Sequence, residues 1–125
     1  MIILNDLKSL LVSNNVISSD SVIFNFDETV SESDRMVLLL KGGSSNDLAK
    51  NSDITVFAKS LSMQTADSLI NSAFAVLVPD KNFQKTISVN QNIMLIKAVS
   101  PPYYREKEKN GTHVFTFDLQ IIHKN

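Results

Sequence analysis

Apolar residues recur at helical spacing in two segments, which predicts two amphipathic helices. The first spans 2–14 and ends at Asn14-Asn15; its apolar positions are Ile3, Leu4, Leu7, Leu10 and Leu11. The second spans about 62–78, with a cap at Ser60 or Ser62 and a stop at Pro79. Its apolar stripe follows the spacing i, i+3, i+4, i+7, i+8 and i+11 and comprises Ala66, Leu69, Ile70, Ala73, Phe74 and Leu77.

Six other segments have the short apolar runs or the alternation of β-strands. The continuous run 35–41 is typical of a strand covered on both faces. The strongest pattern is 112–122, where we expect one face to point into the core and the other toward solvent. The inward positions are Phe115, Phe117, Leu119 and Ile121, and they alternate with Val114, Thr116, Asp118 and Gln120. The other predicted strands are 22–26, 53–60 (with Ile54, Val56 and Ala58 on one face), 85–89 and 91–99.

Three polar segments are expected to be loops. The segment 27–35, DETVSESDR, is acidic and rich in serine, as in an exposed turn. The segment 42–52, GGSSNDLAKNS, predicts a long and mobile hairpin tip. The segment 100–111, SPPYYREKEKNG, is longer than the few residues that a plain connection needs, and it holds two tyrosines among alternating charges.

The predicted order is α–β–β–β–α–β–β–β within a single domain, 1–125. It indicates an α+β fold, in which an N-terminal helix and a longer helix pack on one mostly antiparallel sheet of about six strands. A chain of 125 residues that is 43% hydrophobic can bury one core of this kind.

The composition narrows the classes of function. A net charge of −1 provides no long-range attraction to nucleic acid or acidic lipid. The absence of cysteine excludes disulfides, zinc–thiolate sites and thiol nucleophiles, and it suits a cytosolic protein. We expect no signal peptide, because the N-terminus lacks a basic leader and a cleavage site. We also expect no membrane span, because no apolar run approaches roughly 20 residues.

Side chains able to carry chemistry are present but poorly arranged. His113 and His123 lie ten residues apart on one predicted strand, roughly 33 Å at about 3.3 Å per residue, so they cannot share a metal. We expect both to be partly exposed. The acidic segment with Asp27, Glu28, Glu32 and Asp34 lacks the glycine and ligand spacing of a calcium loop.

Phosphate and hydrolase motifs are also missing. In 41–47, KGGSSND, the lysine precedes the glycines and a strand follows, which is the wrong order for a phosphate-binding loop. No serine has a G-x-S-x-G setting. The sequence therefore predicts no enzyme, no metal site and no cofactor. The single basic and aromatic stretch, 103–109, contains glutamates that offset its charge, so it is a weak nucleic-acid motif.

The layout of the chain resembles the tail terminator, or tail completion, proteins of long-tailed bacteriophages. One similar part is the strand–helix unit DITVFAKSLSMQTADSLINSAFAVL. The other is SPPYYREKEKNGTHVFTFDLQIIHKN, a proline-containing loop and a glycine turn before a final aromatic strand. Pro101 or Pro102 matches the proline and Asn110-Gly111 the turn. Family members often carry a glycine and an aspartate inside this loop, where this chain has Arg105 to Lys109.

The resemblance implies a ring, usually a hexamer, that caps the tail tube, stops its growth and meets the head–tail connector. Its partners would be copies of itself, the major tail tube protein, the connector protein and, without sequence preference, the genomic DNA in the lumen. It would be located in the virion tail or neck, after assembly in the host cytoplasm. No catalysis, cofactor or membrane is implied.

Interface candidates come from the two long loops, because a ring needs head-to-tail contacts between identical subunits. Tyrosines suit an interface, since each buries much area and keeps a polar tip; the alternative is that they fold back on their own subunit. The basic residues either contact a neighbouring ring or the DNA, or form a solvated charge run. The candidates are Tyr103, Tyr104, Arg105, Lys107, Lys109, Gly42 and Gly43.

Other functions stay open at this point. Another neck or connector protein of a phage would share most of these features. A small intracellular module that binds a ligand through 42–52 is a different class, and a hydrolase is a third for which no residue can be nominated.

Overall fold

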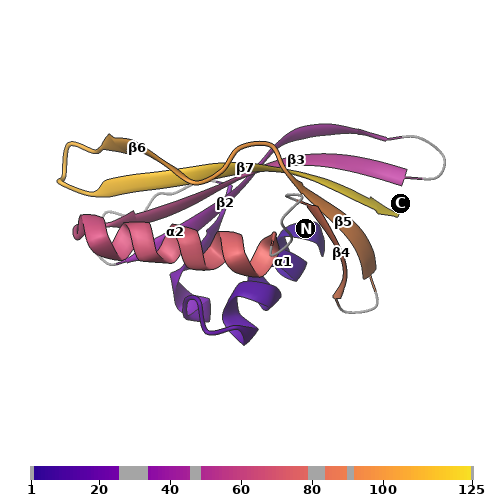
Figure 1. Cartoon of the computed structure of the whole chain (residues 1–125), viewed down its shortest axis with the longest axis horizontal. Helices are drawn as coiled ribbons and strands as arrows, with labels where there is room; N and C mark the ends of the chain where they lie inside the picture. The colour runs from indigo at the N-terminus through magenta and orange to yellow at the C-terminus, as the bar shows by residue number, and fades with distance from the viewer. Residues whose placement is uncertain (1, 26–33, 46–48, 79–83, 90–91, 125) are drawn as a thin grey trace.

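The chain folds as a curved sheet with both helices on one of its faces (Figure 1). The structure is a computed structural model, and it describes residues 2–25, 34–45, 49–78, 84–89 and 92–124. The helices are α1 (Ile2–Ser13) and α2 (Met63–Leu77), and a short 3-10 turn, η1, spans Ser19–Ser21. The strands are β1 (Val22–Phe24), β2 (Arg35–Ser45), β3 (Ala49–Ser60), β4 (Gln84–Val89), β5 (Asn92–Ala98), β6 (Tyr103–Lys107) and β7 (His113–Lys124).

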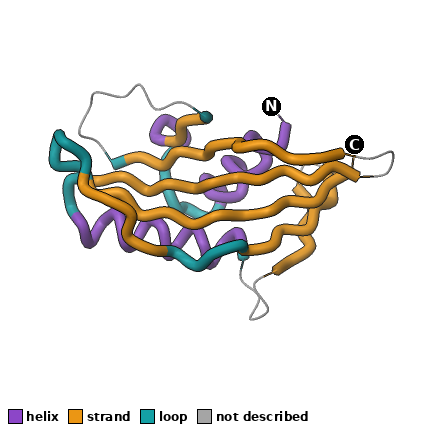
Figure 2. Tube along the Cα trace, turned by 90° about the horizontal axis from the view of Figure 1, so that it is seen from above, coloured by secondary structure: helices purple, strands orange, loops and turns teal. Residues whose placement is uncertain are grey.

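The sheet has the order β1-β2-β3-β7-β5-β4, and β6 also pairs with β7. Only the β1–β2 pair is parallel; the other described pairs are antiparallel. Figure 2 shows the long strands side by side above the helices. The predicted α+β class and the element order are confirmed, and the structure adds a seventh strand, β6.

Both helices lie within one residue of their predicted bounds. Ser62 caps α2, since its side chain accepts a hydrogen bond from the backbone N–H of Thr65. At the end of α1, Asn15 has a φ of 59°, a left-handed conformation that asparagine tolerates, and Val16 donates to the carbonyl of Leu11. The predicted stop at Pro79 lies outside the described residues.

The core lies between the helices and one face of the sheet, which we call the helix face. Helix α2 buries the predicted stripe, with Ala66, Ile70, Ala73 and Leu77 fully buried and Leu69 and Phe74 partly so. In α1 the buried positions are Leu4, Leu7 and Leu11, whereas Leu10 is only partly buried. On the sheet, the largest contribution is Phe117, whose ring meets Phe74 edge-on at a centroid distance of 5.1 Å.

The opposite, outer face is more buried than its sequence predicts. On β7, Val114 and Thr116 are 2% and 1% exposed although we expected them to face solvent. Val114 lies in a cross-strand row with Arg35, Lys59 and Glu106, and these long side chains shield it. The run 35–41 is covered on both faces as predicted, with Met36 on the helix face and Val37 on the outer face both buried.

Two of the predicted loops are wrong because backbone pairing extends into them. Within 42–52, Gly42–Ser45 continue β2 after a bulge and pair with Lys50–Asp53 of β3, and 46–48 fall outside the described residues. Within 100–111, Tyr103–Lys107 form β6 on the edge of β7. The expected turn 27–35 falls mostly outside the described residues, apart from Asp34 and Arg35, the latter the first residue of β2.

Replacing Phe117 by alanine should lower the free energy of unfolding by about 3–5 kcal/mol, because the side chain is fully buried and its removal leaves a cavity beside Phe74. Urea denaturation of the two proteins measures the difference. The control is Phe115→Ala on the same face of β7, where the ring is only partly buried and a smaller loss is expected. An equal loss at both positions would contradict the assigned core.

Candidate functional site

Strand β6 carries most of the residues that the sequence predicts for an interface. All five of its residues are exposed, and in the described part of the chain its only partner strand is β7. The prolines explain how the chain reaches it. Val99 and Ser100 still donate to the carbonyl of Asp118 as the chain leaves β5. Pro101 and Pro102 have no N–H to continue this ladder, and pairing with β7 resumes at Tyr103.

The two tyrosines present aromatic surface from opposite faces of β6. Tyr103 is opposite Thr116 and 47% exposed, whereas Tyr104 is opposite Phe115 and 41% exposed. The Tyr104 ring packs edge-on against Phe115 at 5.1 Å, and its hydroxyl lies 3.1 Å from Nδ1 of His113. Tyr104 therefore contacts its own subunit with one side of the ring and leaves the other side open.

The basic residues of the segment have different environments. Arg105 sits at the bulge in β6, and its guanidinium lies over the ring of Phe57 at 5.3 Å, 3.9 Å from the carboxylate of Glu106. Lys107 is exposed opposite His113, and Lys109 is exposed in the turn after β6. The structure thus holds Arg105 against the sheet and leaves the two lysines toward solvent.

The turn between β6 and β7 is tightly hydrogen-bonded. Glu108 N–H donates to the carbonyl of Thr112, Gly111 N–H donates to that of Glu108, and the side-chain oxygen of Asn110 accepts from Thr112 N–H. Gly111 has a φ of +90°, which L side chains rarely adopt. Asn110-Gly111 is therefore a turn, as predicted, and 103–124 is one β-hairpin.

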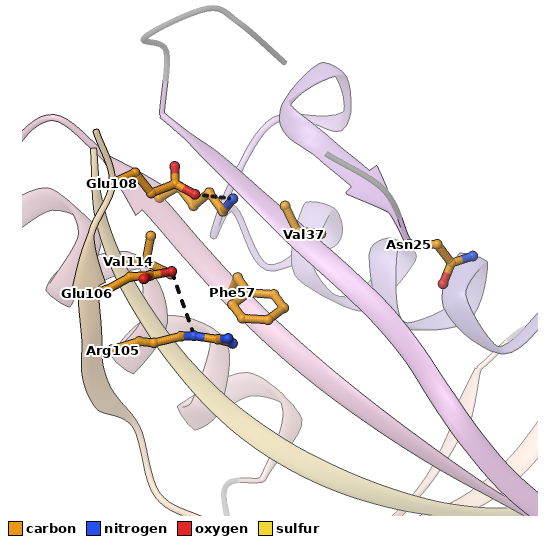
Figure 3. A pocket seen from close by; sticks show the side chains of 8 residues that line it. Asn25, Val37, Phe57, Arg105, Glu106, Glu108 and Val114 are labelled. Atoms are coloured by element: carbon orange, nitrogen blue, oxygen red, sulfur yellow. Dashed lines mark hydrogen bonds and ion pairs between the residues drawn. The ribbon is translucent and has the colours of Figure 1, made fainter. Parts of the chain in front are cut away.

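A shallow depression of about 270 Å³ lies on the outer face beside this hairpin (Figure 3). Its apolar floor is formed by Val37, Phe57 and Val114. Figure 3 shows Glu106 joined to Arg105, while Glu108 is joined to a second basic side chain; that partner is Lys59, at 3.1 Å. The remaining lining residue is Asn25. Sequence reasoning missed Glu108 and Lys59, because no local motif links residues 49 positions apart.

Gly42 and Gly43 lie far from β6. They belong to the distal hairpin, which we define as Lys41–Ser45 of β2 with Lys50–Asp53 of β3, at the end of the molecule opposite β6 (Figure 1). A Cβ added at Gly42 would meet nothing within 4 Å, so this glycine is not required by packing. The structure therefore separates the seven predicted interface residues into two groups at opposite ends.

The other chemical candidates are not brought together. His113 and His123 are both partly buried, and His123 lies 3.0 Å from the hydroxyl of Ser52. Among the described residues, no group of three or more histidine, aspartate or glutamate side chains could hold a metal. Asp34 accepts a hydrogen bond from the hydroxyl of Ser60, and the other acidic residues of 27–34 are outside the described ranges. No helix in the described ranges is long and apolar enough to cross a membrane.

The fold resembles that of solved structures, although their sequences differ greatly. One is a chain described as the virion of a native gene transfer agent particle, with a TM-score of 0.61 and 8% identity, over 97% of this chain and 93% of that chain. Another has a TM-score of 0.57 and 6% identity, over 97% of this chain and 89% of that chain. No protein-family model and no curated protein matches the sequence. At these identities the likeness establishes the fold.

Replacing Gly111 by alanine should lower the free energy of unfolding by about 1–2 kcal/mol, because its positive φ strains any L side chain. The nearest side-chain atom, Cδ2 of Leu61, would be at 3.6 Å, an ordinary contact, so the loss comes from the backbone. In Gly42→Ala, where φ is not positive and space is open, the change should stay within about 0.5 kcal/mol. Urea unfolding of both variants tests this, and equal losses would refute the turn geometry.

Proposed function

We propose that this chain is a structural virion protein of a long-tailed bacteriophage, of the tail terminator type. The observation that carries the proposal is the agreement of fold over nearly the whole length of both chains with a protein described as part of a gene transfer agent virion. In this role the chain forms a ring that caps the tail tube, ends its polymerisation and joins it to the head–tail connector. Another neck or connector protein is the nearest alternative.

The position of the candidate surfaces supports a ring. A ring of identical subunits requires two different surfaces, each fitting the other on the next copy. The β6 end and the distal hairpin lie at opposite ends of the long axis of the molecule (Figure 1). Among the residues whose burial is described, none of β6 or the distal hairpin belongs to the core between the helices and the sheet, so contact at these residues leaves the core closed.

The side chains of β6 suit a contact of this kind. Tyr103 and Tyr104 are two of the five large apolar side chains exposed in the described chain; Leu61, just before α2, and Met63, its first residue, are two more. Large exposed aromatics are enriched at interfaces because they bury much area for few rotatable bonds. Phe115 and His113 already orient Tyr104, which lowers the entropy lost on binding.

The proposed role brings several partners. The ring, usually a hexamer in this family, would contact the tail tube protein on one side and the connector on the other. Lys107 and Lys109, with the exposed part of the Arg105 side chain, would face a neighbouring ring or the DNA that passes through the lumen without sequence preference. The proposed role includes no catalytic step, no cofactor and no membrane, and places the protein in the virion tail or neck after assembly in the host cytoplasm.

Light scattering of the purified protein, together with electron microscopy of virions, tests the proposal. A ring with a mass of about six times the 13.9 kDa of the chain, or incorporation at the neck, is expected. A protein that is strictly monomeric and absent from the neck would contradict it. Recovery in the neck but not at the end of isolated tails would favour the connector alternative.

The double variant Tyr103→Ser/Tyr104→Ser should remain folded but lose at least about tenfold in affinity for its neighbour, because exposed aromatic anchors dominate such contacts. Sedimentation gives the association constant, and circular dichroism reports the fold. Tyr103→Phe, which keeps the aromatic side chain, should assemble as the original protein does. If the double variant unfolds, the tyrosines serve their own core and the interface assignment fails.

A further inference from the structure

Glu108 joins the β6–β7 hairpin to the two strands beyond β7. Its carboxylate is 3.1 Å from Nζ of Lys59 on β3 and 3.7 Å from a guanidinium nitrogen of Arg35 on β2. Arg35 is only 2% exposed, and the Lys59 side chain is 13% exposed. One acidic side chain in the turn thus bridges to two cations held in the sheet, and we call this arrangement the Glu108 bridge.

The pairing registers explain why the bridge crosses the outer face. Arg35 is opposite Lys59, and Lys59 is opposite Val114, so the three residues form one row across β2, β3 and β7. Glu108 comes just after β6, pairs with the two cations and lines the same depression as Val114. Val114, in the same row as the cations, is 2% exposed. The bridge is therefore a contact between the turn and the sheet surface, separate from the backbone pairing of β6 with β7.

Glu106 provides a contrast within the same hairpin. It ends the same row, opposite Val114, but its side chain is 56% exposed and its ion pair is with the adjacent Arg105, at 3.9 Å. An exposed pair of this kind contributes little to stability, whereas a carboxylate that neutralises poorly exposed cations contributes more. Glu106 and Glu108 carry the same charge and lie two positions apart, yet Glu108 therefore contributes more to the stability of the hairpin.

Strand β6 is weakly anchored by its own side chains, because none of the five is buried. All five residues are exposed, the strand has a bulge between Tyr104 and Glu106, and it pairs with β7 along one edge. A short strand with no buried side chain opens easily by local unfolding. Holding the turn to β2 and β3 restrains the end of the strand farthest from Pro102.

We infer that Glu108 is a positioning residue: through the Glu108 bridge it keeps the hairpin, and with it Tyr103 and Tyr104, in one conformation before any partner binds. The ordering of the hairpin is a property of the isolated chain. Only the statement that this conformation is the one that docks rests on the proposed function. The surface is thus formed in advance, and the cost of ordering it is not incurred on assembly.

Amide hydrogen exchange on the full-length chain tests the inference, with Glu108→Gln and the matched control Glu106→Gln. In Glu108→Gln the amides of Tyr104–Lys107 should exchange about tenfold faster, while those of Ile54–Ala58 in β3 keep their rates. Glu106→Gln should exchange like the original protein. Equal rates in the two variants, or the same acceleration in β3 as in β6, would overturn the assignment.

A second variant keeps the test decisive if Glu108→Gln folds poorly. Lys59→Gln removes the closer cation of the bridge and should accelerate β6 exchange in the same way. In the double variant Lys59→Gln/Glu108→Gln, the acceleration should be smaller than the product of the two single accelerations. The reason is that each substitution removes the same ion pair between Lys59 and Glu108. Independent, fully multiplicative effects would show that the bridge is not the cause.

Association measurements separate this inference from the proposed function. If both are right, Glu108→Gln weakens self-association while Tyr103→Ser weakens it without changing β6 exchange. If the original protein does not associate and is absent from the neck, the proposed function fails, yet faster β6 exchange in Glu108→Gln still supports the positioning role. If association occurs and Glu108→Gln leaves both β6 exchange and affinity unchanged, the positioning role is refuted and the proposed function stands.

Discussion

The antiparallel pairing of β3 with β7 is the constraint on which the rest of the structure depends. It runs without a register shift from Ala49–Lys124 to Ser60–His113 and places Val56 opposite Phe117. Side chains alternate between faces with a period of two, so a slip of one residue would turn Phe117, Leu119 and Ile121 away from the helices. The other edge of β7 carries both β5 and β6, so the position of the candidate surface is set by the same strand that supplies the centre of the core.

The two faces of the sheet are stabilised by different physical means. Burial of apolar side chains under α1 and α2 holds the helix face. On the outer face, ion pairs and long side chains cover a small apolar floor, with Arg105 over Phe57 and Glu108 between Arg35 and Lys59. This second arrangement holds a charged hairpin against the sheet without taking side chains from the core. The aromatic side chains of β6 are consequently displayed by a strand on which all five residues are exposed and Tyr104 packs on Phe115 at the surface.

The core is separate from the two ends of the molecule. The β6 end and the distal hairpin project from a sheet whose centre is packed by the helices (Figure 1). The fold itself recurs over almost the entire chain in a structure whose sequence is 8% identical.

Local periodicity in the sequence by itself determined both helices, the inward face of β7 around Phe117 and Leu119, and the turn at Asn110-Gly111, because each depends on residues close in the chain. Only the tertiary structure decided that Tyr103–Lys107 is a strand, since this charged segment has no apolar alternation and gains its hydrogen bonds from β7. The same holds for Gly42–Ser45, which pair with β3. The candidate residues could be listed from the sequence, but their division between two ends could not. Nor could the bridge of Glu108 to Lys59, because residues 49 positions apart meet only when the sheet has set its registers.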